Sequence, residues 1–201
     1  ITFPASGSTT SVGSLIVGSA SNTQQVTAAG NVTSSGDVTY RAGAFVNSAS
    51  VTSNNGNVLL QADNVDLSTT ANVNIAALNG SVTIAPRSDN RVIDLGTEVI
   101  GRLSLTSAEV NRVSAGTLRI GALNGTNTGD INITDALNPA LTPTLALRTG
   151  SPGSVSSTGV RSITETNLAV QAGGTISLAA NNVISGNLAL NSPASTLTFN
   201  Q

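Results

Sequence analysis

The sequence has no cysteine, histidine, methionine, tryptophan or lysine among its 201 residues, and charged residues make up only 9% of it. Without cysteine and histidine, the chain cannot assemble a disulfide framework, a zinc site or a Ser-His-Asp triad. The eight basic residues, all arginine, form no cluster that would attract nucleic acid. No apolar run approaches the roughly 18 residues of a transmembrane helix. We therefore expect neither nucleic-acid binding nor membrane insertion.

Aromatic residues are also scarce, at 2% of the chain. A compact globular core normally uses aromatic side chains for much of its buried area, so the interior here must consist of Val, Ile, Leu and Ala. Ser, Thr and Asn together account for 74 residues, a composition that also occurs in disordered chains. The apolar content of 39% and its regular alternation favour a folded chain instead. Such a core suits a narrow tube with one repeated cross-section.

A short pattern recurs along the chain: an apolar residue, a small polar residue and a second apolar residue, with Gly, Asn or Ser between copies. Its clearest copies are Asn57-Val58-Leu59-Leu60, Asn64-Val65-Asp66-Leu67, Asn72-Val73-Asn74-Ile75, Ser81-Val82-Thr83-Ile84, Thr117-Leu118-Arg119-Ile120, Asp130-Ile131-Asn132-Ile133, Thr175-Ile176-Ser177-Leu178, Asn187-Leu188-Ala189-Leu190 and Thr196-Leu197-Thr198-Phe199. Strict alternation places every second side chain on one face, which is a strand pattern. From Val58 the pattern returns after 7, 8 and 9 residues, so three strands close a coil of roughly 20 to 25 residues. The pattern predicts a β-solenoid.

Residues 1–201 are expected to form a single all-β, parallel β-helix (β-solenoid) segment of roughly 8 to 10 coils, part of a longer chain or filament. Two loop excursions interrupt the pattern, at residues 86–113 and 135–144. The first contains a predicted helical turn at residues 107–112 with Ser107 as its N-cap. The second contains Pro139 and Pro143, which cannot donate to a strand ladder. These excursions are where a specific contact would be sought.

Asparagines open several of the predicted strands, and two interpretations stay open for them. Stacked coils would place equivalent Asn side chains about 4.8 Å apart, where their amides could form a hydrogen-bonded ladder. Alternatively, each Asn only allows a turn at a corner of the coil.

Residues 81–121 resemble a known family. The resemblance is carried by Ser81-Val82-Thr83-Ile84-Ala85-Pro86, Asp94-Leu95-Gly96, Leu103-Ser104-Leu105-Thr106, Ala108-Glu109 and Ala115-Gly116-Thr117-Leu118-Arg119-Ile120-Gly121. In this order they are similar to a recurring stretch in the repeat regions of filamentous-haemagglutinin-like exoproteins of Gram-negative bacteria, which are secreted by a two-partner route. The close similarity covers about 40 residues, and the looser pattern extends over nearly all of the chain.

The resemblance implies a right-handed β-helix exported through an outer-membrane transporter and displayed as a fibre at the cell surface or released. Proteins of that family act in adhesion, aggregation and biofilm formation, or as stalks for toxic tips. The family's amino-terminal secretion domain, with its Asn-Pro-Asn motif, has no counterpart here; the nearest dipeptide, Asn138-Pro139, lies in mid-chain. The resemblance therefore implies that this segment is shaft.

The densest group of charges lies in the first excursion. It comprises Arg87, Asp89, Arg91, Asp94 and Glu98. One interpretation is a surface loop that contacts an anionic glycan or a neighbouring shaft. The other is surface salt bridging that pins a loop, at less than about 1 kcal/mol per pair.

Carboxylates are the candidate catalytic groups, since a glycosidase needs two of them about 5–10 Å apart across a sugar-binding cleft. Asp63 with Asp66 and Asp130 with Asp135 are close in sequence, and Tyr40 is the only aromatic residue that could lie outside the core as a sugar platform. The loop at residues 124–130 has one carboxylate, where calcium sites use several. We expect no catalytic residues, no metal site and no cofactor.

These observations predict the structural shaft of a secreted or cell-surface bacterial filamentous adhesin or extracellular fibre, located outside the cell and without enzymatic activity. Its expected partners are neighbouring solenoid segments or copies of itself, host or matrix glycans, and the transporter during export. Two alternatives stay open: a carbohydrate-binding or carbohydrate-cleaving β-helix protein, and a self-assembling fibre subunit that stacks end to end.

Overall fold

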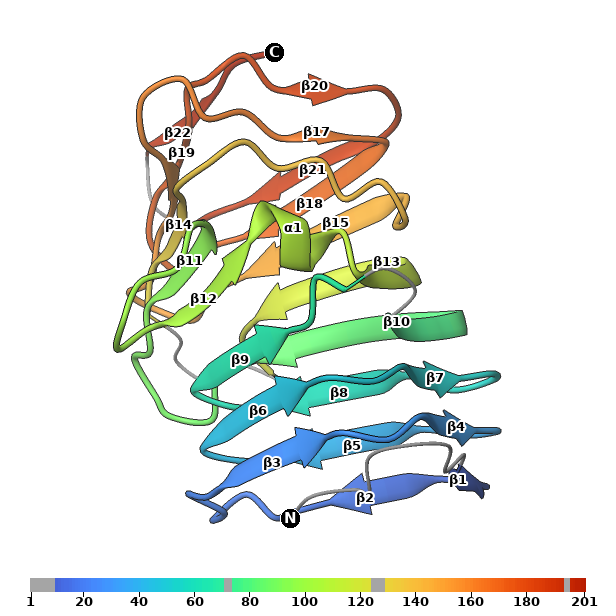
Figure 1. Cartoon of the computed structure of the whole chain (residues 1–201). Coiled ribbons are helices and arrows are strands. Elements are labelled where there is room, and N and C mark those ends of the chain that lie inside the picture. Colours follow the sequence, from blue (N-terminus) through green and yellow to red (C-terminus); the bar gives the residue numbers. More distant parts are fainter. Residues whose placement is uncertain (1–9, 71–73, 124–128, 194–195) are drawn as a thin grey trace.

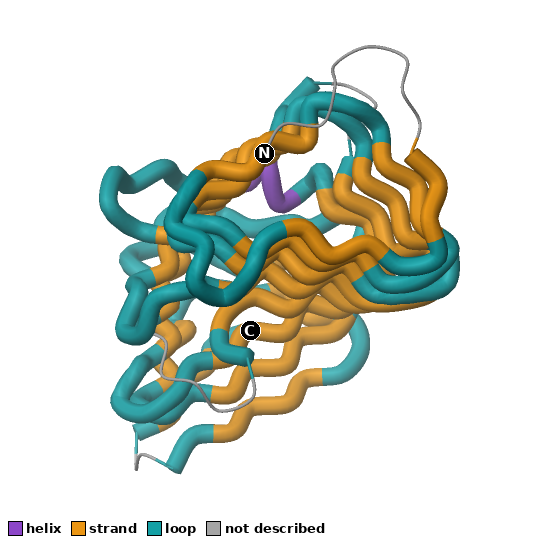
Figure 2. The backbone as a smooth tube through the Cα atoms, turned by 90° about the horizontal axis from the view of Figure 1, so that it is seen from below, coloured by secondary structure: helices purple, strands orange, loops and turns teal. Residues whose placement is uncertain are grey.

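The chain forms a β-solenoid of about eight coils, as the sequence predicts. The computed structural model describes residues 10–70, 74–123, 129–193 and 196–201. Throughout these ranges every strand ladder is parallel. Figure 1 shows the coils stacked along one axis, and Figure 2, seen along that axis, shows the strands of successive coils lying over one another. The predicted strand start at Asn72-Val73 and the loop at residues 124–128 lie outside the described residues.

Three faces surround the N-terminal coils. The first face contains β1 (Thr10–Val12), β4 (Val32–Ser34), β7 (Val51–Ser53) and the opening parts of β10 (Ile75–Ala85) and β13 (Val113–Gly121). The second face runs the length of the solenoid as β2 (Leu15–Val17), β5 (Val38–Arg41), β8 (Val58–Gln61), the closing parts of β10 and β13, β15 (Thr144–Arg148), β18 (Asn167–Gln171) and β21 (Leu188–Asn191). The third face begins with β3 (Gln25–Ala28), β6 (Ala44–Asn47) and β9 (Asn64–Leu67).

The C-terminal coils are built from the second face and two further sheets. The larger sheet follows the order β12 (Leu103–Thr106), β11 (Ile93–Gly96), β14 (Ile131–Ile133), β16 (Val155–Ser157), β19 (Ile176–Leu178) and β22 (Leu197–Phe199), with β12 next to β9. The smaller sheet pairs β17 (Thr164–Glu165) with β20 (Val183–Ile184). Leu137 forms an isolated parallel bridge with Ile163, so part of the Pro-bearing excursion still follows the stack.

The second face shows the repeat length directly, because one inward position can be followed through all of its strands. In register these are Leu15, Val38, Val58, Val82, Leu118, Leu145, Leu168 and Leu188. Successive positions are 20 to 27 residues apart, except that 36 residues separate Val82 from Leu118. The longer coil contains the excursion predicted at residues 86–113.

The core is a set of such inward columns of aliphatic side chains. From Val38 to Leu168 each member of the column above is at most 1% exposed. The neighbouring column contains Tyr40, which is also 1% exposed and packs on Phe45 with ring centroids 4.8 Å apart. The expectation that Tyr40 could serve as a surface sugar platform is therefore wrong: alternation places it inward, two residues after Val38.

The long coil owes its extra length to an additional strand and one helical turn. The chain passes from β11 through residues 97–102 back to β12, which lies on the side of β11 nearer the N-terminal coils. It then forms α1 (Ser107–Val110) before entering β13.

The N-cap of α1 is Thr106 rather than the predicted Ser107. Thr106 has an extended backbone, and its Oγ1 accepts a hydrogen bond from the Glu109 N–H at 3.2 Å. The Glu109 carboxylate in turn accepts from the Thr106 N–H at 2.8 Å, which completes a capping box. Ser107 is already helical, and its hydroxyl donates to the Ala136 carbonyl. The helical turn itself is confirmed.

Some of the asparagines that open strands form hydrogen-bonded ladders between coils. The Asn187 Nδ2 donates to Asn167 Oδ1 at 3.0 Å, and Asn167 Nδ2 lies 3.4 Å from Thr144 Oγ1 on the preceding coil. Elsewhere Asn57 Nδ2 donates to Asp37 Oδ1 at 3.5 Å, and Asn57 Oδ1 accepts from the Ser81 hydroxyl at 2.8 Å. Ladders do form from coil to coil, but other polar residues take part in them.

Candidate functional site

The charges of the first excursion do not form one cluster. Arg87 pairs with Asp63 at 3.3 Å, and the Arg91 guanidinium donates to the Asp63 backbone carbonyl at 2.8 and 3.1 Å. Burial by itself raises the pKa of Asp63, but hydrogen bonds from Ser88 and the charges of both arginines outweigh it and lower the pKa. These contacts hold the first part of the excursion against the end of β8 and the start of β9.

Asp94 lies in β11, apart from the Asp63 contacts, and its side chain is buried. It is 1% exposed and accepts hydrogen bonds from Arg102 at 3.0 and 3.1 Å and from Asn132 at 2.9 Å. Arg102, which the sequence reasoning did not single out, comes from the 97–102 loop that folds over β11. Asp89 is exposed elsewhere in the excursion. The cluster expected from sequence is thus divided into separate structural contacts.

Glu98 belongs to a third group, here called the carboxylate corner: Asp66, Glu98 and Glu109. Glu109 is 5% exposed and is held by the Leu67 N–H, the Thr106 N–H and the Thr106 hydroxyl, each at 2.8 Å. Partial burial, followed by the neighbouring charges of Glu109 and Asp66, raises the pKa of Glu98 to about 7. At a pKa of about 7, roughly half of the Glu98 carboxyl groups hold a proton at neutral pH, which reduces the repulsion between Glu98 and Glu109.

Asp130 and Asp135 each accept a hydrogen bond from a backbone N–H. Asp130 accepts from the Ser154 N–H at 2.8 Å, and Asp135 accepts from the Ala136 N–H at 2.8 Å. Asp66 is exposed, as its alternation with inward apolar residues predicts. Among the residues that the structure describes, no group of three or more acidic side chains is placed to hold a metal ion.

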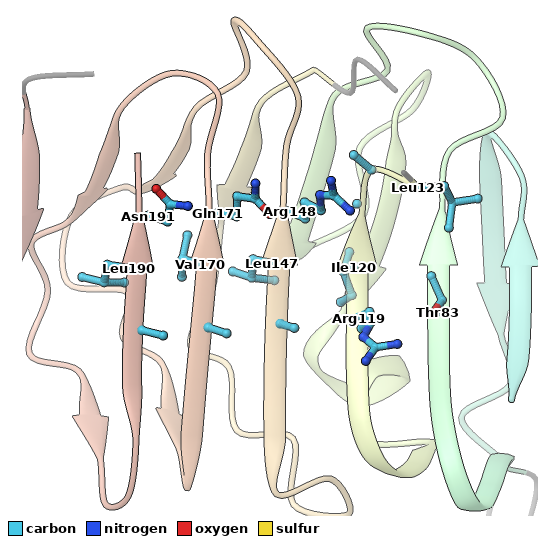
Figure 3. A pocket seen from close by; sticks show the side chains of 15 residues that line it. Thr83, Arg119, Ile120, Leu123, Leu147, Arg148, Val170, Gln171, Leu190 and Asn191 are labelled. Atoms are coloured by element: carbon cyan, nitrogen blue, oxygen red, sulfur yellow. The ribbon is translucent and has the colours of Figure 1, made fainter. Parts of the chain in front are cut away.

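A concave surface lies on the second face, over β13, β15, β18 and β21. We call it the axial groove; its volume is about 450 Å³. It is lined by Thr83, Arg119, Ile120, Gly121, Ala122, Leu123, Ala146, Leu147, Arg148, Ala169, Val170, Gln171, Ala189, Leu190 and Asn191. Figure 3 shows these residues distributed over adjacent strands.

The floor of the axial groove is a row of three alanines, Ala146, Ala169 and Ala189, paired in register on neighbouring strands. Their row continues at the N-terminal end with Arg119 and Thr83. Because alanine is smaller than the Arg119 and Thr83 side chains of the same row, the surface is hollowed over the three alanines.

One bank of the groove is a polar row two residues further along the same strands: Arg148, Gln171 and Asn191. These three side chains lie in line across neighbouring strands (Figure 3). Gly121 stands at the preceding rung of this row with a backbone φ of +118°, and a Cβ there would lie 1.9 Å from the Arg148 carbonyl oxygen. Only glycine permits this close approach of β13 and β15.

Two arginines give the groove its charge. The Arg119 guanidinium donates to Ser81 Oγ at 3.2 Å, and neither Arg119 nor Arg148 forms an ion pair with any residue that the structure describes. None of the lining residues is acidic. The groove therefore has a local charge opposite to the net charge of −2 of the whole chain.

The sequence reasoning missed Arg119 and Arg148, although it identified the strand that contains Arg119. The signal was the phase of the alternation, which places both residues outward. Aligning the strands by their inward residues makes Arg119 the counterpart of Ala146, and Arg148 its diagonal neighbour.

Comparisons with protein-family models, with curated proteins and with solved structures found no match to this chain. The resemblance to filamentous-haemagglutinin-like exoproteins therefore stays a prediction from the sequence. No helix in the described part of the chain is long and apolar enough to cross a membrane.

Proposed function

We propose that the chain is a structural shaft segment of a secreted or cell-surface bacterial filament, with an adhesive role and no enzymatic activity. The observation that carries this proposal is the open C-terminal coil. Leu188 and Leu197 are 40% and 47% exposed there, whereas Leu168 and Ile176, their partners on the preceding coil, are at most 1% exposed. The apolar interior thus continues to the end of the described stack without a cover.

A further solenoid rung is the partner that fits this end. β21 and β22 are the last strands of their sheets and each has a ladder partner on one side only. A parallel strand from a neighbouring segment or copy would pair with these edges and bury the exposed leucines. We infer an extended assembly in which this segment transmits force along its axis and presents its outward rows to the surroundings.

Location and assembly are tested together by immunogold electron microscopy of intact producing cells, using antibodies raised against this chain. We expect label along fibres that extend from the cell, and loss of the label when the cells are treated with protease. A cytoplasmic protein serves as the control for cell integrity. Label confined to the cytoplasm would contradict the proposal.

The self-assembling subunit is the second candidate, and the same open coil favours it. Electron microscopy of the purified chain separates the two: a monodisperse monomer of solenoid length excludes end-to-end polymerisation. The carbohydrate-cleaving alternative is tested by incubation with polysaccharides, with Asp63, Asp66, Asp130 and Asp135 changed in turn. Carboxylate-dependent turnover would overturn the structural role.

A further inference from the structure

The axial groove offers a chemistry that a plain shaft does not need. Its floor is three methyl groups, its bank carries hydrogen-bonding groups, and its N-terminal end carries two guanidinium groups without carboxylate partners among the described residues. Arg119 and Arg148 lie on adjacent strands, and Arg119 is in register with Ala146, two residues before Arg148. Both therefore border the same space.

The geometry of the groove suits a linear polymer lying along the solenoid axis. Neighbouring strands of a sheet are about 4.8 Å apart, so the outward rows repeat their groups at that interval. The alanine floor crosses β15, β18 and β21. A second polar row, Thr144, Asn167 and Asn187, lies two residues before the alanines on the same face.

A peptide strand fits this surface poorly. β15 and β18 are each paired on both sides, so a peptide strand lying across the floor could pair only at the outer edge of β21. The alanine row also provides no separate pockets for the alternate side chains of a peptide. A polysaccharide needs neither: its ring C–H groups can pack on methyl groups while its hydroxyls bond to the amides of the bank.

We propose that the axial groove binds a linear polysaccharide that carries carboxylate groups, with its sugar rings over Ala146, Ala169 and Ala189 and its carboxylates paired with Arg119 and Arg148. Guanidinium groups bind carboxylates through charge-assisted, often bidentate hydrogen bonds. The ligand class follows from charge complementarity, since none of the lining residues is acidic. This inference goes beyond the shaft role and does not depend on it.

The direct test is isothermal titration calorimetry of the full chain with a ten-residue oligogalacturonate. Arg119→Gln and Arg148→Gln are each expected to weaken binding about tenfold, because each removes one charge-assisted contact. Ala169→Leu, which fills the floor without changing the charge, is expected to weaken binding to a similar extent. All three positions face outward, and circular dichroism verifies that the variants keep the fold.

The matched control is Arg41→Gln. Arg41 occupies the same outward row as Arg148 on the same face, where it donates to Gln61 at 3.3 Å, but it does not line the groove. This variant is expected to bind within about twofold of the unmodified chain, since it leaves both groove arginines in place.

Three further ligands decide between sources of the same charge. The methyl-esterified oligogalacturonate is neutral and should not bind, whereas dextran sulfate and poly-glutamate should bind more weakly than oligogalacturonate. Preference for dextran sulfate would overturn the carboxylate assignment, and equal binding of poly-glutamate would overturn the polysaccharide assignment. The proposal is also wrong if oligogalacturonate does not bind or if Arg41→Gln weakens binding as much as Arg148→Gln. Each of these results would leave the shaft role untouched.

Discussion

Replacing Glu109 by alanine should be among the most damaging single changes outside the aliphatic core. Its carboxylate is buried and accepts hydrogen bonds from the Leu67 N–H of β9 and from the N–H and hydroxyl of Thr106 at the end of β12. Hydrogen bonds to charged groups contribute about 1.5–3 kcal/mol each, and buried donors left without partners cost about 1–3 kcal/mol each. Since two N–H groups lose their partner, we expect a loss of about 4 kcal/mol.

Thermal and urea denaturation followed by circular dichroism measure this loss. For a chain of this size, about 4 kcal/mol corresponds to a melting temperature lower by about 8–16 °C. Glu109→Gln keeps one acceptor oxygen and should lose about half as much. Hydrogen exchange locates the effect, because the amides of Leu67 and Thr106 should lose their protection while those of β18 keep it.

Two results of these measurements would refute the role assigned to Glu109. The reasoning fails if Glu109→Ala unfolds within about 0.5 kcal/mol of the unmodified chain, the range of ordinary surface substitutions. It also fails if the Leu67 amide stays protected in the variant. Thr106→Ala combined with Glu109→Ala should cost less than the sum of the two single changes, because the capping box joins them.

Three other predictions concern individual residues. The folded chain holds a proton on Glu98 between about pH 4.5 and 7 that the unfolded chain releases, so stability should fall as the pH rises through this window. Glu98→Gln should remove that dependence and be more stable by about 1 kcal/mol at pH 8 in urea titrations, a value reduced by solvent screening, with no difference at pH 4. Gly121→Ala should lower the melting temperature markedly, because Gly121 has a positive φ and an added Cβ would clash with the Arg148 carbonyl. Gly116→Ala is the control and should not lower it, because its Cβ would meet nothing nearer than 3.5 Å. Equal melting temperatures for the two variants would contradict the argument. Asn182→Ala should cost about 3 kcal/mol, because this buried amide donates to three backbone carbonyls and accepts from one N–H; a calorimetric loss below about 0.5 kcal/mol would contradict it.

Much of the fold could be predicted because the alternation of side chains has a period of two and is repeated in every coil. That period determines which residues face inward, as with Val82 and Ile84, and the spacing of the copies determines the size of the coil. The excursion at residues 86–113 could be located for the same reason, since it is where the alternation stops.

The arrangement within the excursion could not be predicted from alternation. Asp94 sits between two inward residues of β11 and should face solvent, yet Arg102 and the 97–102 loop cover it. The position of β12 between β9 and β11 likewise depends on a return of the chain that no local pattern encodes. Tertiary contacts within the long coil that contains β11 and β12 decide both features. Proximity in sequence therefore predicted a charge cluster that the fold separates.

The axial groove could not be predicted from the sequence because the residues of its floor and bank come from the outward rows of several coils. Inward columns such as Leu147, Val170 and Leu190 must stay apolar in every coil, because each member packs on the next. Outward rows have a weaker constraint, so their composition can differ more from coil to coil. A site of this kind is defined by register between coils rather than by a local motif. The row that runs from Thr83 through Arg119 to Ala189 is therefore recognised only when the strands are aligned in register.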